Sequence, residues 1–317
     1  MTVSMPIREG YGRALAEYGA VEPRLVVLDA DTSSSTLSSF FAARFPDRFF
    51  NVGIAEPCMV DMAVGLALGG LIPFVNGFAA LLSLRALEQI RTCIAYARTN
   101  VKLAASYAGV SDFKDGPTHH AITDLAIMRA LPGMVVVVAA DAAEAARWVP
   151  ILARHEGPAY LRLSRGSALP VGNHDLELEV GRGLVLKTGG DVTLIGTGTM
   201  VGRCLRAAEE LAREGISARV LELHTLKPID VELIRLAAEE TGALVSAEEH
   251  SIVGGLGSSV AEVLAGTAPA PLERVGIADR FARTGPDPET LMDAFGLSVG
   301  AIASAARRAM GRKKTGR

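Results

Sequence analysis

The sequence predicts an α/β protein made of two doubly wound domains, each a largely parallel sheet covered by helices. Short β-branched runs alternate with longer amphipathic stretches, the pattern of strand–helix–strand units. The chain has 317 residues, which is long for one hydrophobic core. Its 33 glycines and its aromatic content of 5% suit tight strand–helix turns and small side chains.

The first domain is expected at residues 1–170, followed by a linker at 171–183 and a second domain at 184–317. Proline, glycine, asparagine and charged residues interrupt the alternation in the linker. In the first domain we predict strands at 25–28, 72–75, 101–106, 135–139 and 160–163, and helices at 82–98 and 142–155. In the second domain we predict strands at 192–195, 218–222, 243–247 and 272–275, and helices at 201–214, 231–241 and 257–265.

Composition excludes several classes of function. A net charge of −3 offers no electrostatic basis for binding nucleic acid or acidic membranes. Three widely spaced cysteines (Cys58, Cys93 and Cys204) predict neither a disulfide framework nor a zinc site. The sequence shows neither a signal-peptide pattern nor an apolar stretch of about 18 residues. We therefore expect a cytoplasmic protein that does not span a membrane.

The most informative segment is NVGIAEPCMVDMA at residues 51–63, where an apolar-aromatic run passes into a helical pattern. Glu56 stands at the junction. A carboxylate there is partly desolvated, so its pKa should rise and it can share a proton with a ligand nitrogen. Alternatively, Glu56 simply caps the helix, because a carboxylate is favoured at a helix N-terminus. The residues alone leave both interpretations open.

A second polar cluster is DGPTHH at residues 115–120. Gly-Pro favours a turn, so Asp115 and His119 should be displayed on a loop. An imidazole near an aspartate suits proton transfer or a hydroxyl hydrogen bond near neutral pH. An ordinary surface turn is the alternative.

Other candidates lie where predicted strands end. Asp31 follows a buried strand and precedes hydroxyl residues that include Ser35, which places polar groups at a carboxyl edge. Arg8 and Arg165 carry guanidinium groups, whose planar fork suits phosphate. Each arginine taken singly is more often a surface ion pair. Phe78 has an aromatic face that can hold a flat heterocycle, although a lone phenylalanine in an apolar run usually belongs to the core.

These segments together resemble the transketolase family of thiamine-diphosphate-dependent enzymes. GIAE around Glu56, DGPTHHAITDLAIMRALPGMVVVVAADAAEA, PAYLRLSRG, LELHTLKPID and AEEHSIVGGLG carry the resemblance, which extends from about residue 8 to residue 302. It implies a pyrimidine-binding domain followed by a transketolase C-terminal domain. The glycines of GGLG serve packing in that family, so we assign them no catalytic role. Gly196-Thr-Gly198 is only half of a dinucleotide fingerprint and does not predict NAD binding.

The resemblance also implies roles for individual residues. Glu56 hydrogen-bonds the aminopyrimidine ring of thiamine diphosphate, and Phe78 stacks on that ring. Asp31 approaches the thiazolium side of the cofactor. The remaining candidates contact the donor sugar or its phosphate: Asp115, His119, Arg8, Ser35 and Arg165.

Four departures from the family pattern leave the shape of the pocket open. Pro57 replaces the glutamine that usually follows the glutamate, and Tyr107 stands where transketolases commonly have histidine. Leu81 and Leu84 occupy positions at which the family tends to have aromatic residues. The residue after His119, namely His120, also varies in the family.

In the family, the diphosphate is held through Mg²⁺ on a separate domain by a GDG…Asn segment. Magnesium requires nearly octahedral oxygen ligation, and Gly-Asp-Gly does not occur in this sequence. The resemblance therefore indicates the C-terminal subunit of a split transketolase, active only with an N-terminal subunit that supplies the Mg²⁺ and diphosphate site. The predicted reaction is transfer of a two-carbon ketol unit between sugars, with phosphorylated sugars favoured by the two arginines.

Two alternatives remain: the β subunit of a 2-oxoacid dehydrogenase E1 component, and a non-catalytic, partner-binding relative.

For assembly, we predict a homodimer of this chain alone and an α2β2 tetramer with the partner. The dimer is expected to pair through an apolar helix face made of Ile54, Met59, Met62, Ala63 and Leu66, where Ala63 and Gly65 permit close approach.

Overall fold

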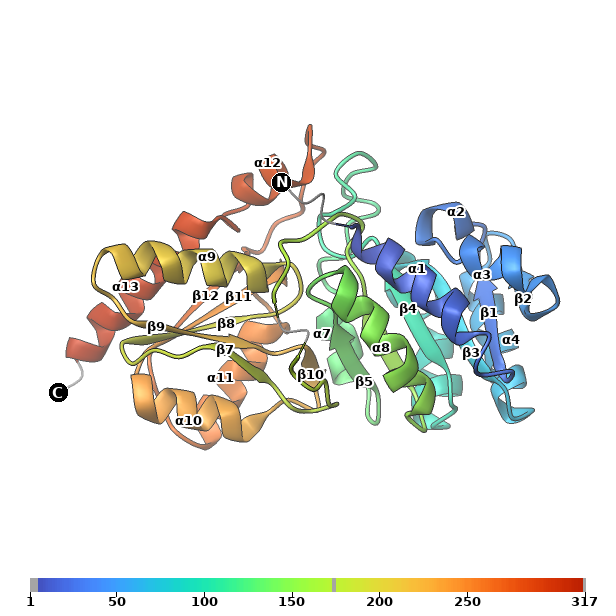
Figure 1. Cartoon of the computed structure of the whole chain (residues 1–317), viewed down its shortest axis with the longest axis horizontal. Coiled ribbons are helices and arrows are strands. Elements are labelled where there is room, and N and C mark those ends of the chain that lie inside the picture. Colours follow the sequence, from blue (N-terminus) through green and yellow to red (C-terminus); the bar gives the residue numbers. More distant parts are fainter. Residues whose placement is uncertain (1–4, 173–174, 316–317) are drawn as a thin grey trace.

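The computed structural model describes residues 5–172 and 175–315 and has two lobes, each built around its own sheet (Figure 1). The first half of the chain forms one lobe and the second half forms the other, which confirms the predicted fold class. None of the described helices has the length and apolar character that a membrane span requires.

Six parallel strands from the first half of the chain form most of the first sheet. They are β1 (Leu25–Asp29), β2 (Phe49–Asn51), β3 (Ile72–Phe78), β4 (Lys102–Ser106), β5 (Val135–Val138) and β6 (Ala159–Arg162). Across the sheet they follow the order β5-β6-β4-β3-β1-β2. β1, β4 and β5 are buried along their whole length, as parallel strands are when helices cover both faces.

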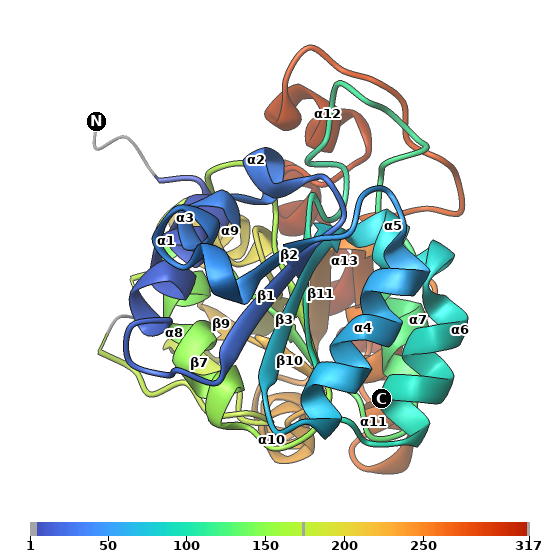
Figure 2. The ribbon, with the colours of Figure 1, turned by 90° about the vertical axis from the view of Figure 1, so that its right-hand side faces the viewer.

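Helices cover both faces of this sheet (Figure 2). One side carries α1 (Ile7–Tyr18), α3 (Ser39–Arg44) and α8 (Ala142–Arg154). The other side carries α4 (Glu56–Leu68), α5 (Ala79–Arg85), α6 (Leu87–Gln89), the π-helix η2 (Ile90–Tyr96) and α7 (Asp124–Ala130). Two short helices, α2 (Ser33–Thr36) and the 3₁₀ turn η1 (Pro46–Arg48), lie between β1 and β2.

The second sheet has five strands in the order β12-β11-β8-β9-β7, all parallel except the edge strand β7. The strands are β7 (Leu184–Lys187), β8 (Val192–Gly196), β9 (Ala218–Glu222), β11 (Leu244–Ser251) and β12 (Leu272–Ile277). The helices are α9 (Met200–Arg213), α10 (Val231–Thr241), α11 (Leu256–Gly266), α12 (Pro288–Ala294) and α13 (Val299–Thr315).

The two lobes share a strand. β10 (Thr225–Lys227) comes from the second half of the chain but pairs antiparallel with β5, where Thr225 lies opposite Val137. It thereby becomes the edge strand of the first sheet. One hydrophobic core correspondingly contains residues of both halves, such as Val136 and Leu226. The shared strand and the common core join the lobes firmly.

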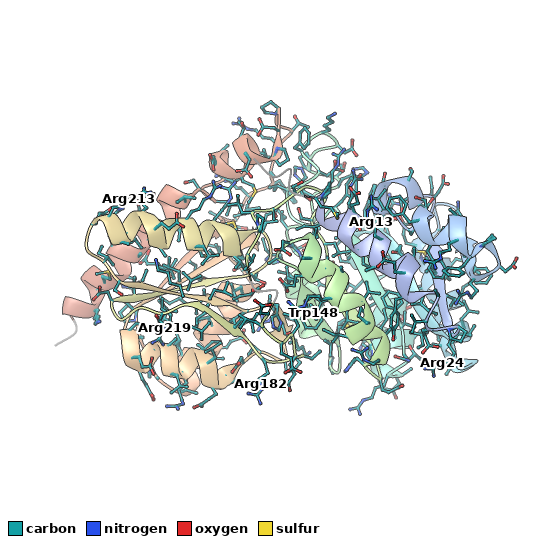
Figure 3. The ribbon with its side chains drawn as sticks, viewed as in Figure 1. Arg13, Arg24, Trp148, Arg182, Arg213 and Arg219 are labelled. Carbon is teal, nitrogen blue, oxygen red and sulfur yellow. The ribbon has the colours of Figure 1, made fainter. Side chains whose placement is uncertain are left out.

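The junction also buries Trp148, the single tryptophan of the chain. Figure 3 shows it between the lobes. Its indole Nε1 donates to Glu144 Oε1 at 2.9 Å, and its ring meets the ring of His224 edge-on, with centroids 5.0 Å apart. Residues of α8 and of the segment that leads into β10 therefore pack against each other.

The predicted helix at 82–98 was wrong as a single element. The structure divides this region into α5, which already begins at Ala79, the short α6 and the π-helix η2. A continuous α-helical pattern does not reveal a change in hydrogen-bond register, because the apolar spacing of the three pieces is nearly the same.

Candidate active site

The predicted site residues lie at one edge of the first sheet. Asp31 follows β1, Phe78 ends β3 and Arg165 follows β6. Because these strands are parallel, their carboxyl ends meet at one edge, where open α/β sheets bind ligands. The loop of residues 107–123, between β4 and α7, rises from this edge at the top of the molecule in Figure 1.

Arg8 joins three segments at this edge. Its guanidinium Nη1 donates to the carbonyl oxygen of Ser35 at 2.7 Å and to the hydroxyl of Tyr107 at 2.9 Å. Arg8 and Ser35 thus lie together, although the arginine meets the backbone carbonyl of Ser35 rather than its hydroxyl. Tyr107, noted in the sequence only as a departure from the family, is the third member of this group.

Asp31 is held at the surface by Asn51 of the neighbouring strand. The Asp31 N–H donates to Asn51 Oδ1 at 3.1 Å, and Asn51 Nδ2 donates to the Asp31 carboxylate at 3.2 Å. Asp29 is buried instead and accepts hydrogen bonds from the hydroxyls of Thr36 and Ser38. Asp29 therefore shapes the loop, whereas Asp31 remains exposed to a ligand.

The two histidines of the 107–123 loop have different environments. His120 is buried, and its Nε2 lies 2.9 Å from the carbonyl oxygen of Asp112. Burial lowers the pKa of His120, which keeps the ring neutral. His119 is half-buried, with its Nδ1 3.0 Å from Thr118 Oγ1 and its ring edge-on to Phe78 at 6.0 Å. His120 stabilises the loop, and His119 faces the edge where a ligand would lie.

Arg165 forms an ion pair with a residue that the sequence analysis did not single out. Its Nη1 lies 2.9 Å from Oδ1 of Asp112. The guanidinium also lies near the rings of Tyr107 and Phe113, 5.0 and 5.5 Å from their centroids. In the sequence, Asp112 looks like any charged residue of a solvated loop, so only its position in the fold reveals this contact.

Asp112 is fully buried, whereas Asp115 is exposed. Burial, followed by the nearby carboxyl group of Asp115, raises the pKa of Asp112 to about 6, against the opposing effects of Arg165 and His119. Oδ2 of Asp112 has no hydrogen-bond partner among the described residues. A buried carboxyl group with a raised pKa thus lies near the predicted donor-contacting residues Asp115 and His119 and pairs with a predicted phosphate-binding arginine.

Phe78 presents an aromatic ring whose environment differs from the family pattern. The ring of Tyr107 stacks on it, with centroids 4.3 Å apart and an interplanar angle of 28°. Leu81 is half-buried and Leu84 is exposed. The aromatic contact that these leucines do not supply therefore comes from Tyr107, at the end of the adjacent strand.

Glu56 begins α4 and is 2% exposed. Arg85 Nη1 lies 3.2 and 3.3 Å from its two carboxylate oxygens, and the Arg85 side chain is half exposed. Among the described residues, no backbone N–H donates to this carboxylate, so Glu56 does not act as a helix cap. Pro57 stands in the first turn of the helix, where a fixed φ and a missing N–H are tolerated. No sequence motif reveals Arg85 as a partner of Glu56.

The apolar face predicted for this helix was wrong. Met59 and Ala63 are fully buried in the core of the chain, whereas Ile54 precedes the helix and is 75% exposed. Met62 is also exposed, so the predicted residues do not form one face. The 3.6-residue spacing groups Met59 and Ala63 correctly, but Ile54 lies outside the helical repeat.

The glycine-rich segment before α11 serves packing. The Glu248 carboxylate accepts hydrogen bonds from the N–H groups of Leu256 and Gly257 at 2.7 and 2.8 Å. A Cβ atom at Gly255 would collide with the same carboxylate. These contacts explain the glycines without a ligand.

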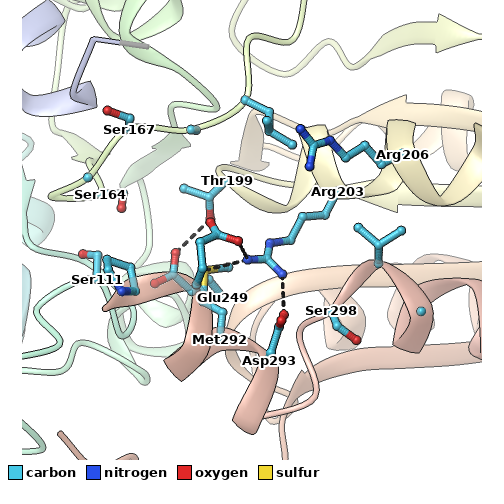
Figure 4. A pocket seen from close by; sticks show the side chains of 17 residues that line it. Ser111, Ser164, Ser167, Thr199, Arg203, Arg206, Glu249, Met292, Asp293 and Ser298 are labelled. Carbon is cyan, nitrogen blue, oxygen red and sulfur yellow. Dashed lines mark hydrogen bonds and ion pairs between the residues drawn. The ribbon is translucent and has the colours of Figure 1, made fainter. Parts of the chain in front are cut away.

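A separate cavity of about 510 Å³ lies between the lobes (Figure 4). Ser111 and Ser164 line it from the first lobe, and Thr199 and Arg203 line it from the second. Arg203 Nη1 donates a hydrogen bond to Asp293 Oδ1 at 3.0 Å. The residues predicted from the sequence as site residues do not line this cavity, but its two serines directly precede the buried aspartate and the arginine of the ion pair described above.

The missed residues share one property: their importance arises from pairing across the fold. Tyr107 is 99 residues from Arg8, Arg165 is 53 residues from Asp112, and Arg85 is 29 residues from Glu56. A local sequence pattern contains no signal for such pairs. Of these residues, Tyr107 was the easiest to notice in the sequence, because it stands where the family commonly has histidine.

The fold and the edge residues define the class of protein: a pyrimidine-binding domain joined to a C-terminal domain, as in thiamine-diphosphate-dependent enzymes. Residues 3–169 match the pyrimidine-binding domain of transketolase, and residues 181–302 match the transketolase C-terminal domain. The chain therefore belongs to the transketolase family, as the sequence motifs predicted.

Its relatives include subunits of split transketolases. The 6-deoxy-6-sulfo-D-fructose transketolase subunit SqwH of Clostridium sp. (strain MSTE9) is 41% identical over 307 residues, which cover 97% of this chain and 95% of the relative. A putative transketolase C-terminal section of Methanocaldococcus jannaschii is 43% identical over 300 residues, 94% of each chain. A solved structure described as a split gene transketolase, inactive beta4 tetramer, is 46% identical with a TM-score of 0.89, covering 98% of this chain and 100% of that one.

Proposed function

We propose that this chain is the C-terminal subunit of a two-chain, thiamine-diphosphate-dependent transketolase, which transfers a two-carbon ketol unit between sugars. The observation that carries the proposal is the buried Glu56 carboxylate, which accepts hydrogen bonds from Arg85 and not from its own helix. The similarity to split transketolase subunits of matching length supports it.

The residues present suit the aminopyrimidine half of the cofactor. Glu56 would hold the proton that the carboxylate shares with the ring nitrogen, and Phe78 would provide an aromatic face. Arg85 is half exposed, so it can move away from Glu56 when a ring enters. Thiamine diphosphate, when bound, supplies the nucleophilic carbon that attacks the donor carbonyl.

The loop residues would position the donor sugar. His119 would exchange a proton with a sugar oxygen, a role that imidazole groups take in general acid–base catalysis. Asp115 is exposed on the same loop and would accept a hydrogen bond from a hydroxyl. Asp31 would lie near the thiazolium side of the cofactor.

The diphosphate and its Mg²⁺ would be held by the partner, an N-terminal subunit with a GDG…Asn segment, because this sequence contains no Gly-Asp-Gly. The test is reconstitution. The purified chain with thiamine diphosphate and Mg²⁺ should show no ketol transfer, and addition of the N-terminal subunit should produce it. Turnover by this chain alone, free of contaminating enzyme, would contradict the proposal.

The same reconstituted pair decides between the alternatives. Transfer to a lipoyl domain instead of a sugar acceptor would indicate the β subunit of a 2-oxoacid dehydrogenase E1 component. Tight association without either activity would indicate a non-catalytic relative. The named sugar transketolase among the relatives favours sugar transfer.

A further inference from the structure

The charge of Arg165 already has a partner within the chain. Asp112 Oδ1 lies 2.9 Å from Arg165 Nη1, and the Asp112 side chain is fully buried. The Arg165 side chain is 25% exposed. Its backbone N–H donates to Ser111 Oγ at 3.1 Å. Because both its backbone and its guanidinium are held, Arg165 is already part of an ion pair and is not free to bind an anion.

The surrounding charges are also partly offset. Arg8, Arg165 and the exposed Lys114 bring three positive charges to the edge, and Asp112 and Asp115 bring two carboxyl groups. Only Nη1 of Arg8 is occupied, by the carbonyl of Ser35 and by a tyrosine hydroxyl, and Nε of Arg8 has no hydrogen-bond partner among the described residues. A dianion that entered beside Arg165 would meet two carboxyl groups that offset most of the positive charge, and it would have to displace a buried carboxylate from its partner.

A neutral, hydroxylated group can bind at the same site without displacing the Asp112 carboxylate from Arg165. A hydroxyl donates one hydrogen bond and accepts others, so it can bridge a carboxylate and a guanidinium. The exposed Asp115 and the outward part of Arg165 offer such a pair. The charge arrangement favours a hydroxyl over a phosphate.

We propose that Asp112 neutralises Arg165 and thereby sets the substrate class of this site: a sugar whose end at Arg165 is uncharged and hydroxylated, not phosphorylated. The inference rests on the ketol transfer proposed above. Asp112 acts through Arg165 and is a positioning residue. This proposal departs from the phosphorylated substrate expected from the two arginines, because the sequence did not reveal that one of them is paired with a buried aspartate.

The first test measures anion binding by this chain alone, so it does not depend on the partner. Sulfate is the probe, because it remains a dianion throughout the neutral range. Calorimetric titration at about pH 8, where Asp112 is ionised, should show no saturable binding at millimolar sulfate for the wild type. Asp112→Asn should bind sulfate about ten- to a hundredfold more tightly, the effect of freeing one charge-assisted contact.

Two variants separate this effect from folding and from bulk charge. Asp112→Glu retains the carboxylate and should remain as weak as the wild type. Glu179→Gln removes a carboxylate from the exposed Glu179–Arg182 pair, far along the chain from the site, and should also remain weak. Saturable sulfate binding by the wild type that Asp112→Asn leaves unchanged would overturn the inference.

The second test uses the reconstituted pair with sugars that differ only in a terminal phosphate. The wild type should have the lower KM for the unphosphorylated sugar, and Asp112→Asn should lower the KM for the phosphorylated one while kcat changes little. A wild type that prefers the phosphorylated sugar would overturn the inference and leave ketol transfer standing. Absence of transfer from every sugar, with sulfate binding as expected, would contradict the proposed function and support the role of Asp112.

Discussion

Two side chains of the candidate site depend on backbone in the left-handed region. Asp31 has φ 63° and Tyr107 has φ 60°, a conformation that residues other than glycine rarely adopt. Such residues cost on the order of 1–3 kcal/mol and persist where surrounding contacts hold them. Here Asn51 holds Asp31, and Arg8 holds Tyr107. Because strain of this kind gathers at ligand sites, the backbone provides evidence for the site that is independent of its motifs.

At the scale of single residues, Glu56→Gln should reduce ketol transfer by the reconstituted pair by about 10²–10⁴-fold, the usual range for a general acid–base group. Glutamine cannot hold the proton shared with the ring nitrogen. The thermal unfolding temperature should change little, because the amide is isosteric. Exchange of the cofactor C2 proton measures the step directly.

Glu88→Gln is the matched control, because Glu88 is an exposed glutamate on the nearby α6. It should retain full exchange. An exchange rate near that of the wild type in Glu56→Gln would show that Glu56 has only a structural role.

At the scale of elements, α1 and α8 pack so closely that one glycine has no room for a side chain. A Cβ atom at Gly10 would lie 2.1 Å from the carbonyl oxygen of Ala142. Gly10→Ala should therefore lower the free energy of unfolding by about 1–3 kcal/mol, since backbone must shift to relieve the contact. Urea unfolding followed by the fluorescence of Trp148 measures it.

Gly311→Ala provides the comparison within a helix. Gly311 lies in α13, where an added Cβ atom meets nothing within 4 Å. Alanine there should stabilise the chain by up to about 1 kcal/mol. Equal effects of the two substitutions would show that α1 and α8 do not pack as described.

The segment that carries β10 across to the first sheet predicts a pH dependence. His224 is fully buried, and burial lowers its pKa to about 4, with Arg147 acting in the same direction and Asp230 against it. The unfolded chain, with an ordinary histidine pKa of about 6.5, binds more protons between these values. Stability is thus fully present above about pH 6.5 and is lost as the pH falls towards 4, by about 2 kcal/mol between about pH 7 and pH 5.

Urea unfolding of the wild type and of His224→Asn at both pH values measures this contribution. The variant should lose about 2 kcal/mol less than the wild type over the same interval. The comparison uses the change with pH, so a lower absolute stability of the variant does not affect it. Identical pH dependence of the two proteins would show that folding does not lower the pKa of His224.

At the scale of the whole molecule, α4, α5, α6 and η2 cover one face of the first sheet (Figure 2). Five large apolar side chains on or near these helices are exposed. They are Ile54, Met62, Leu68, Leu84 and Tyr96. α4 contacts α5, α6 and η2, so this side of the lobe is a continuous layer. Exposed apolar groups gathered in one layer are typical of an interface. These exposed side chains support the predicted homodimer better than the predicted α4 face does, because Met59 and Ala63 of that face are buried.

Light scattering at micromolar concentration should therefore give a dimer for this chain and an α2β2 tetramer with its partner. Gly65 lies on α4, where an added Cβ atom meets nothing within 4 Å of the same chain. Gly65→Glu should leave the monomer folded and weaken the dimer, and Gly311→Glu should not. A monomeric wild type would contradict the dimer. A tetramer of this chain alone, the assembly named for a related structure, would show a second self-interface.

Much of the fold could be predicted because its signals are local. The runs at 135–139 and 192–195 are β-branched and became buried strands, and 231–241 became a helix with the predicted bounds. Among the site residues, Glu56 and His119 stood in recognisable motifs. β10, by contrast, was not predicted as a strand of the first sheet, because three residues carry too little pattern to identify a partner strand.

By itself, the sequence determined the fold class, the family and the placement of several candidate residues at one sheet edge, because alternation of apolar runs and short motifs is encoded over a few neighbouring residues. Only the tertiary structure decided the state of the site's charges. Asp112 and Arg165 are 53 residues apart, and Glu56 and Arg85 are 29 apart. Whether a charged side chain is solvated or paired depends on what the fold places within about 4 Å of it, and that distance is a property of packing that the order of residues does not display.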